Sequence, residues 1–266
     1  MCKFFGVSRA AYYGWVKQMD RPDRDEARKQ LIREAYEHSR GTYGYRRIGI
    51  WIQTNKGHLI NHKAVLRLMN SLQIRSIARK RKIFKRTSEL ESYHRYENVL
   101  NREFTASRPN QKWVTDITYI HTQQGWAYLS TIKDLFDGFI VAHQISTENS
   151  PALVLNTIKQ AKHKEQITDG LLLHSDQGLQ YTSHAYHQLT QDYSITPSMS
   201  RRGNCWDNAV IENFFGHLKE EALRHVRNPT LNELNNIVDD YIHFYNYERI
   251  QLKTRQTPFQ TRCLSL

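Results

Sequence analysis

The hydrophobic pattern of this chain changes its period near residue 109. Residues 25–75 place apolar side chains at helical spacing, whereas from Lys112 onward apolar and polar positions alternate, as in a half-buried strand. Strand-like runs follow at 112–120, 126–136, 139–146, 171–175 and 195–200, the last two alternating with helices. This order predicts an α/β fold, a mixed sheet with flanking helices, preceded by a small all-α domain.

The net charge of the chain divides at the same boundary. Residues 1–108 contain 24 Lys and Arg against 10 Asp and Glu, while residues 109–266 contain 14 against 16. A basic surface of this size attracts polyanions. The front part therefore predicts a nucleic-acid-binding module ahead of a nearly neutral second domain (109–266). A basic surface that serves only solubility is the alternative.

Two helical segments make up the first part of the basic region. Residues 1–20 are typical of the end of a helix-turn-helix, with Ser8 as an N-cap, and we interpret them as a partial remnant. Residues 25–75 predict a three-helix, helix-turn-helix-like DNA-binding domain, in which Asn61 caps the third helix. Candidate phosphate contacts in this domain are Arg46, Arg47, Lys63 and Arg67. A solvated helix face remains the alternative for each of them.

Residues 76–108 are predicted to form a basic linker. Seven basic side chains and no acid occur in the run 75–86, and such a run cannot bury itself. We expect it to follow a phosphate backbone. A nuclear-targeting signal is the weaker alternative. The candidate DNA contacts are Arg79, Lys80, Arg81, Lys82, Lys85 and Arg86.

Two absences in the sequence narrow the class of protein. Cys2, Cys205 and Cys263 are isolated, so neither a disulfide framework nor a structural zinc site is predicted. There is also no run of about eighteen apolar residues, so no membrane span is expected. We expect a reduced, cytoplasmic protein.

Three acids in separate segments are the candidate catalytic residues. Asp116 lies within a strand, Asp176 ends an apolar strand, and Glu212 lies on a helix, with thirty-five residues between Asp176 and Glu212. Three carboxylates from separate elements suit two divalent metal ions that act on phosphodiesters. A lone Asp is more often a cap or a surface charge, but the combination favours a site. Asn208 and Lys219 share the helical face of Glu212 and are candidate DNA contacts. Other acids, assigned to caps, the surface or the surroundings of the site, are Asp134, Asp137, Asp207 and Glu220.

Several stretches resemble the catalytic core of insertion-sequence transposases with the retroviral-integrase fold: WVTDITYI, LLLHSDQGLQYTS, PSMSRRGNCWDNAVIENFFGHLKEE and YNYERIQLKTRQTPFQ. More narrowly, they resemble the second-reading-frame (OrfB) product of bacterial copy-and-paste elements. The resemblance implies a ribonuclease-H-like core. Asp116, Asp176 and Glu212 match its DDE triad, and Lys219 matches the basic residue two turns beyond.

The resemblance also implies an activity and partners. The expected activity is cleavage and strand transfer of element ends with two Mg²⁺ ions, for which Mn²⁺ can substitute. The expected partners are double-stranded DNA at element ends and target, a second copy or higher oligomer on DNA, and a helix-turn-helix protein from an upstream frame. The location would be the bacterial nucleoid. A truncated, non-catalytic DNA-binding regulator and a hydrolytic ribonuclease-H-like nuclease are the alternatives.

Overall fold

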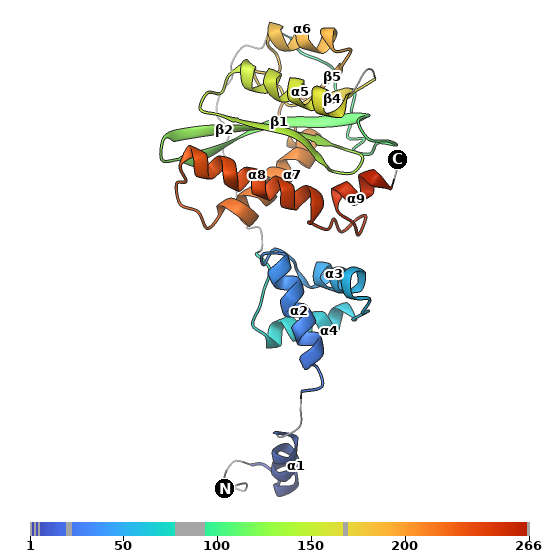
Figure 1. Cartoon of the computed structure of the whole chain (residues 1–266), viewed down its shortest axis with the longest axis vertical. Helices are drawn as coiled ribbons and strands as arrows, with labels where there is room; N and C mark the ends of the chain where they lie inside the picture. Colours follow the sequence, from blue (N-terminus) through green and yellow to red (C-terminus); the bar gives the residue numbers. More distant parts are fainter. Residues whose placement is uncertain are drawn as a thin grey trace. The chain divides into compact units, whose positions relative to one another are not determined.

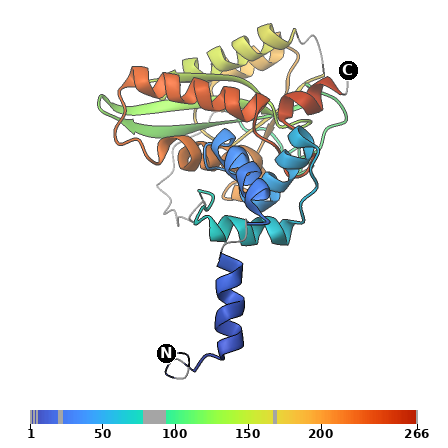
Figure 2. The same cartoon turned by 60° about the horizontal axis from the view of Figure 1, so that its bottom comes forward.

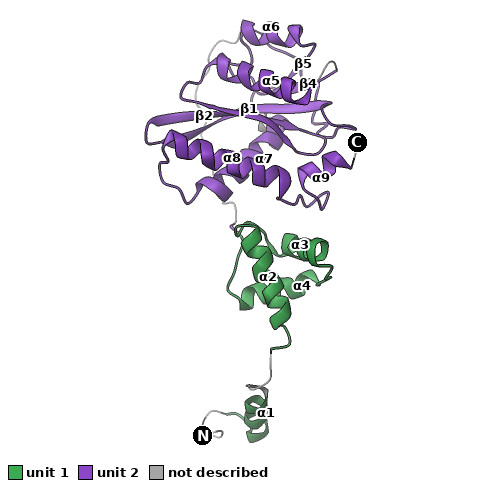
Figure 3. Ribbon diagram, in the orientation of Figure 1, with its two compact units in different colours: residues 1–76 green, residues 77–266 purple. Residues whose placement is uncertain are grey.

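A computed structural model of the chain describes residues 2, 4, 6–19, 23–77, 94–166 and 170–264. The chain consists of two compact units, Met1–Ser76 and Ile77–Leu266 (Figure 3). Each unit is described by itself below. In the described ranges, the longest and most apolar helices still fall short of what a membrane crossing requires.

The first unit is helical and follows the predicted elements. Its helices are α1 (Arg9–Met19), α2 (Glu26–His38), α3 (Tyr45–Lys56) and α4 (His62–Ser71). The predicted cap of α4 is confirmed, because Asn61 Oδ1 accepts a hydrogen bond from Lys63 N at 2.9 Å. Helix α3 ends at Gly57, whose φ of 69° is the left-handed conformation that glycine adopts without strain. Buried apolar side chains of α2, α3 and α4 form the core of this unit: Ile32, Ile48, Ile52, Val65 and Leu68.

The second unit is built on a five-stranded mixed sheet with the strand order β3-β2-β1-β4-β5. The pair β1–β2 and the pair β2–β3 are antiparallel, whereas β1–β4 and β4–β5 are parallel. The predicted mixed sheet is thus confirmed. The strands are β1 (Lys112–Thr122), β2 (Gly125–Asp134), β3 (Ile140–Ser146), β4 (Leu172–Ser175) and β5 (Thr196–Met199).

Helices cover both faces of this sheet, as Figures 1 and 2 show. On one face lie α5 (Pro151–Glu165) and α6 (His184–Asp192). On the other lie α7 (Ala209–Leu218), α8 (Leu231–Tyr247) and α9 (Pro258–Cys263). A 3₁₀ turn, η1 (Cys205–Asn208), precedes α7, and a π-helical turn, η2 (Lys219–Leu223), follows it. The stretch Cys205–Leu223, which includes the helix expected to carry Glu212, thus consists of a 3₁₀ turn, an α-helix and a π-helical turn.

The carboxyl end of the expected linker differs from its prediction. His94 N donates to Thr182 O at 3.0 Å, and Leu100 N donates to Ser198 Oγ at 3.0 Å. Leu100 is only 1% exposed. We call residues 94–103 the strap, because they lie against the second unit rather than linking two parts. The segment 78–93, with the six basic candidates from Arg79 to Arg86, lies outside the described residues.

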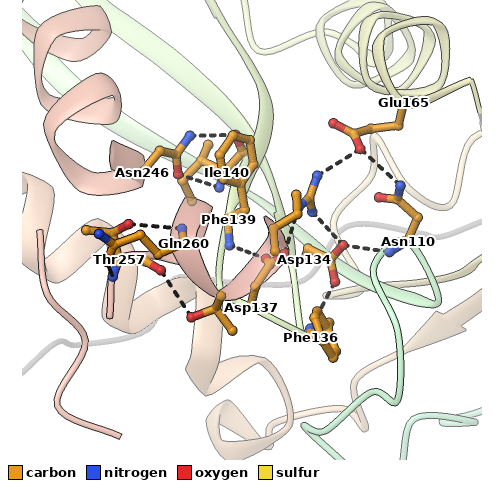
Figure 4. Close-up of polar contacts among 12 residues, drawn as sticks. Asn110, Asp134, Phe136, Asp137, Phe139, Ile140, Glu165, Asn246, Thr257 and Gln260 are labelled. Atoms are coloured by element: carbon orange, nitrogen blue, oxygen red, sulfur yellow. Dashed lines mark hydrogen bonds and ion pairs between the residues drawn. The ribbon is translucent and has the colours of Figure 1, made fainter. Parts of the chain in front are cut away.

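A buried arginine joins α9 to the end of β2, the turn after β2 and the end of α5. Arg262 of α9 donates to Asp134, Asp137 and Glu165 at 2.7 to 2.8 Å. Asp134, the last residue of β2, is 0% exposed, and Asp137, in the turn after it, is 5% exposed. Figure 4 shows Asp134 and Asp137, from the end of β2 and the turn after it, and Glu165, from the end of α5. Asp134 is the register partner of Trp113 near the start of β1, so this cluster lies away from Asp116, which stands further along the strand.

Candidate active site

The sheet brings two of the three predicted catalytic acids side by side. In the parallel pair of β1 and β4, Val114 is the partner of His174. Asp116 and Asp176 each follow two residues later, so they stand at about the same level, Asp116 within β1 and Asp176 one residue beyond the end of β4. Adjacent strands lie roughly 4.8 Å apart and residues two apart share a face. The two carboxylates therefore belong to one site at the carboxyl end of β4, where active sites form in open α/β sheets.

Backbone amides hold both carboxylates in place. Asp116 Oδ1 accepts from Ile117 N at 2.8 Å, and Asp176 Oδ1 accepts from Gly178 N at 2.9 Å. A Cβ atom on Gly178 would lie 3.0 Å from Asp176 Oδ1. Glycine at this position thus permits the close approach that fixes Asp176.

Burial and the neighbouring charges shift the pKa of Asp116. Burial is the largest effect and raises the pKa of Asp116 well above its ordinary value, and the negative charges of Asp176 and Glu212 raise it further. The positive charge of Lys219 opposes them. Burial also raises the pKa of Asp176. The fold therefore gathers Asp116, Asp176, Glu212 and Lys219 into one electrostatic neighbourhood, where negative charge exceeds positive charge.

The site has the donor chemistry of a magnesium site without being a closed cage. Within the ranges that the structure describes, no three His, Cys, Asp or Glu side chains form a ready-made site for one metal ion. Mg²⁺ is usually held by one or two carboxylates together with water and substrate phosphates. A divalent cation would stabilise the charged form of these crowded carboxylates, whose pKa values are raised. The residues present therefore fit this ion.

Lys219 lies between the acids and the part of β1 that enters the β1–β2 hairpin. Its Nζ lies 5.6 Å from the centroid of the Tyr119 ring, on β1. Lys219 is the first residue of η2 and directly follows α7, which carries Glu212. The helical register that was predicted between Glu212 and Lys219 is thus kept until the π-helical turn begins.

Asp207 has a structural role that the sequence did not reveal. Its side chain is fully buried, and it accepts hydrogen bonds from Asn98 Nδ2 at 2.9 Å, Arg102 Nε at 2.8 Å and Arg201 Nε at 2.9 Å. The hydrogen bond from Arg201 lowers the pKa of Asp207 well below its ordinary value; burial opposes this shift and the bond from Arg102 supports it. This buried carboxylate therefore joins the strap to the turn that leads into α7.

Asn208 is placed differently from its prediction as a DNA contact. It is 3% exposed, and neither its amide oxygen nor its amide nitrogen has a hydrogen-bond partner among the described residues. Such burial favours a role inside the turn rather than a contact with DNA.

The basic candidates of the first unit differ in their surroundings. Arg46 and Lys63 are exposed. Arg47 is half-buried, with its guanidinium 5.9 Å from the centroid of the Tyr43 ring. Arg67 Nη2 pairs with Asp25 Oδ2 at 2.6 Å, an interaction that competes with any phosphate. Arg46 and Lys63 are therefore the stronger candidates of the four.

Family models and known relatives agree with this arrangement. The integrase core domain model matches residues 106–205, a second integrase core domain model matches residues 212–266, and a helix-turn-helix-like domain model matches residues 22–82. In Escherichia coli K12, the putative transposase InsK for insertion sequence element IS150 is 38% identical over 257 residues, which cover 96% of this chain and 90% of the relative. The transposase InsF for insertion sequence IS3A is 30% identical over 227 residues, which cover 84% and 78%.

A solved structure shares the fold. In the cryo-EM structure of the simian T-cell lymphotropic virus intasome with the PP2A regulatory subunit B56 gamma, the matched chain has a TM-score of 0.50 and 15% identity, with 86% of this chain and 73% of that chain covered. The mixed sheet with its acids is thus a ribonuclease-H-like integrase core. The chain belongs to the IS3 family of insertion-sequence transposases, of the OrfB type, with a helix-turn-helix-like domain ahead of this core.

Proposed function

We propose that this transposase cleaves DNA strands at the ends of its element and transfers them to target DNA, with Asp116, Asp176 and Glu212 as its catalytic residues. The observation that supports this most directly is the shared level of Asp116 and Asp176 on parallel strands. The charges of both Asp176 and Glu212 act on Asp116, which ties α7 to the same site.

The three carboxylates would hold two Mg²⁺ ions, for which Mn²⁺ can substitute. When bound, two such ions activate the attacking oxygen and stabilise the leaving oxygen of an in-line displacement. Asp116 and Asp176 are held by backbone amides, so they are oriented before any ligand arrives. Lys219 would contact a phosphate beside the scissile one. This chemistry needs no nucleophile from the protein, and Tyr181, which is 1% exposed, is left to a structural role.

Double-stranded DNA, at both the element ends and the target, is the proposed substrate. The surplus of basic residues in 1–108 and the match of a helix-turn-helix-like model support binding of duplex DNA. An oligomer on DNA and an upstream-frame partner remain part of the proposal.

Labelled element ends incubated with target DNA and Mg²⁺ test the proposal. Asp116→Asn, Asp176→Asn and Glu212→Gln should each abolish cleavage and joining while DNA affinity stays close to that of the wild type. Asp192→Asn, which changes an exposed acid of α6, is the matched control and should retain activity. Normal turnover by any of the three catalytic variants would remove that residue from the site. A wild-type protein that cleaves without joining would instead be a hydrolytic nuclease, and one that only binds would be a regulator.

A further inference from the structure

Part of the β1–β2 hairpin presents aromatic rings to solvent. Tyr119 and Trp126 are each 53% exposed, and His121 is exposed as well. Register partners Tyr119–Tyr128 and His121–Trp126 place all four side chains on one face of the hairpin. We call these four residues the hairpin aromatic face. Large exposed rings gathered in one place are typical of binding surfaces.

Contacts between the rings hold this face in a defined arrangement. The Tyr119 and Trp126 centroids are 5.8 Å apart with an interplanar angle of 87°. His121 and Trp126 are 5.1 Å apart at 89°. Edge-to-face pairs of this kind are favourable. Trp126 is therefore fixed between two neighbours while about half of its surface remains open to a ligand.

Basic side chains of Lys219 and of a neighbouring loop lie beside the hairpin aromatic face. Lys219 Nζ lies 5.6 Å from the Tyr119 ring centroid, and its charge also reaches Asp116. The loop 224–229, with the sequence RHVRNP, is exposed from Arg224 to Asn228 and is bonded to the hairpin turn, since Gln123 N donates to Pro229 O at 3.0 Å. Arg224 of this loop pairs with Glu220 at 3.0 Å. Residues 117–133 contain no Asp or Glu. The hairpin itself thus contributes no negative charge next to the rings.

This combination favours a nucleic acid over a second copy of the chain. Two copies that faced each other through this surface would bring like charges together, which is unfavourable. Stacked aromatic rings beside a basic path are the features with which proteins bind single-stranded nucleic acids.

We propose that the hairpin aromatic face binds unpaired nucleotides of the DNA strand next to the active site, with bases stacked on Trp126 and Tyr119 and a phosphate held by Lys219. Alternation along β1 puts Tyr119 and Asp116 on opposite faces of the strand. The link between the rings and the acids is therefore Lys219, whose charge acts on Asp116 while its ammonium group lies over Tyr119. The inference rests on the proposed function, because that function accounts for the presence of this DNA strand at the active site.

Binding of the full-length protein to short duplexes without divalent ions tests the inference separately from cleavage. One duplex is blunt, and the other has a single-stranded extension of a few nucleotides that contains 2-aminopurine, whose fluorescence falls when it stacks. Wild-type protein should quench the probe and prefer the extended duplex. Trp126→Ala should weaken binding of the extended duplex by about tenfold and spare the blunt one. Trp126→Phe should keep most of the preference.

Phe259→Ala provides the matched control. Phe259 is an aromatic residue on α9 and is 41% exposed. Helix α9 follows α8 in the chain, and α8 has 17 residues and is about 25 Å long. The control should bind both duplexes like the wild type. Equal binding of both duplexes by the wild type, or an unchanged preference in Trp126→Ala, would overturn the inference. So would a change of oligomeric state in Trp126→Ala with DNA binding intact, because the face would then join copies of the chain. Cleavage by Asp116→Asn would defeat the proposed function without touching the stacking result.

Discussion

Arg102 Nε donates to Asp207 Oδ1 at 2.8 Å, across 105 residues of sequence. Arg102 belongs to the strap, and Asp207 stands five residues before Glu212, in the turn that leads into α7. The strap thus braces the amino end of the helix that carries the third acid.

Arg102→Ala should therefore reduce kcat for strand cleavage with little change in KM for DNA, because Glu212 would lose its exact orientation rather than its charge. Steady-state cleavage of labelled ends gives both constants. Arg108→Ala, an exposed change just beyond the strap, should leave both constants as they are. A purely structural role would appear as lower thermal stability with unchanged kcat, contrary to this prediction.

Removal of Arg262 should destabilise the second unit in a pH-dependent way. Arg262→Met leaves Asp134, Asp137 and Glu165 buried without their cation, which should cost about 3–5 kcal/mol of unfolding free energy at pH 7. Burial, followed by the charge of Asp137, already raises the pKa of Asp134 from 3.8 to about 6. Because this pKa is raised, the protonated carboxyl stabilises the folded state. This stabilisation is complete below pH 3.8 and is lost as the pH rises through about 6.

The deficit of Arg262→Met should consequently shrink as the pH is lowered from 7 toward 5. Urea unfolding at both pH values measures it. Lys253→Met, an exposed substitution, should show no deficit at either pH. A deficit that grows on acidification would contradict the pKa direction assigned to Asp134.

Glu221 and Arg249 form a second buried ion pair with the opposite pH behaviour. Their closest atoms are 2.7 Å apart, and the side chains are only 6% and 1% exposed. Although burial acts in the opposite direction, hydrogen bonds from His217 and Arg249 lower the pKa of Glu221 from 4.5 to about 2. This carboxylate therefore stabilises the fold above pH 4.5, and its contribution is lost as the pH falls toward 2.

Glu221→Gln should cost about 3–5 kcal/mol at pH 7, because Arg249 would remain buried and uncompensated. Chemical denaturation reports the loss, and the variant should lack the part of the acid-induced destabilisation that Glu221 contributes. Glu220→Gln breaks the neighbouring Glu220–Arg224 surface pair and should cost only about 0.3–0.5 kcal/mol. Equal costs for the two variants would rule out the proposed importance of the buried pair.

Binding of duplex DNA should weaken steeply with salt. Each phosphate neutralised by the run 75–86 releases counterions and adds about 0.9 to the slope of log K against log salt. Replacing Arg79, Lys80, Arg81 and Lys82 by Gln should thus lower the slope by three to four, at about 0.9 for each residue. Fluorescence anisotropy over a range of KCl concentrations measures it. A slope that does not change would remove these residues from the DNA contact.

The elements that could be predicted from the sequence are those that depend on local or periodic signals. Alternating apolar residues predicted β1 to β3, and Asn61 predicted the start of α4, because strand faces and helix caps involve residues a few positions apart. The candidate acids Asp116 and Asp176 could be found for the same reason, since each occupies a recognisable place in a strand pattern. Glu212 was proposed from its place on a helix, and the resemblance matched all three acids to a known triad.

Contacts between residues that are distant in the sequence were decided only by the tertiary structure. The strap was predicted to be linker, because nothing in its composition shows that Arg102 meets Asp207 or that Leu100 is buried. The joining of Arg262 to Asp134, 128 residues apart, has no local signature either.

Exposure was likewise decided by packing. Asn208 lies on the predicted face of Glu212 and is nevertheless buried, whereas Trp126 alternates like a core residue and is half exposed. Periodicity assigns a side chain to one face of an element, but burial depends on which other segments cover that face. Those segments arrive from elsewhere in the chain, and their positions follow from the folded packing rather than from the neighbouring sequence.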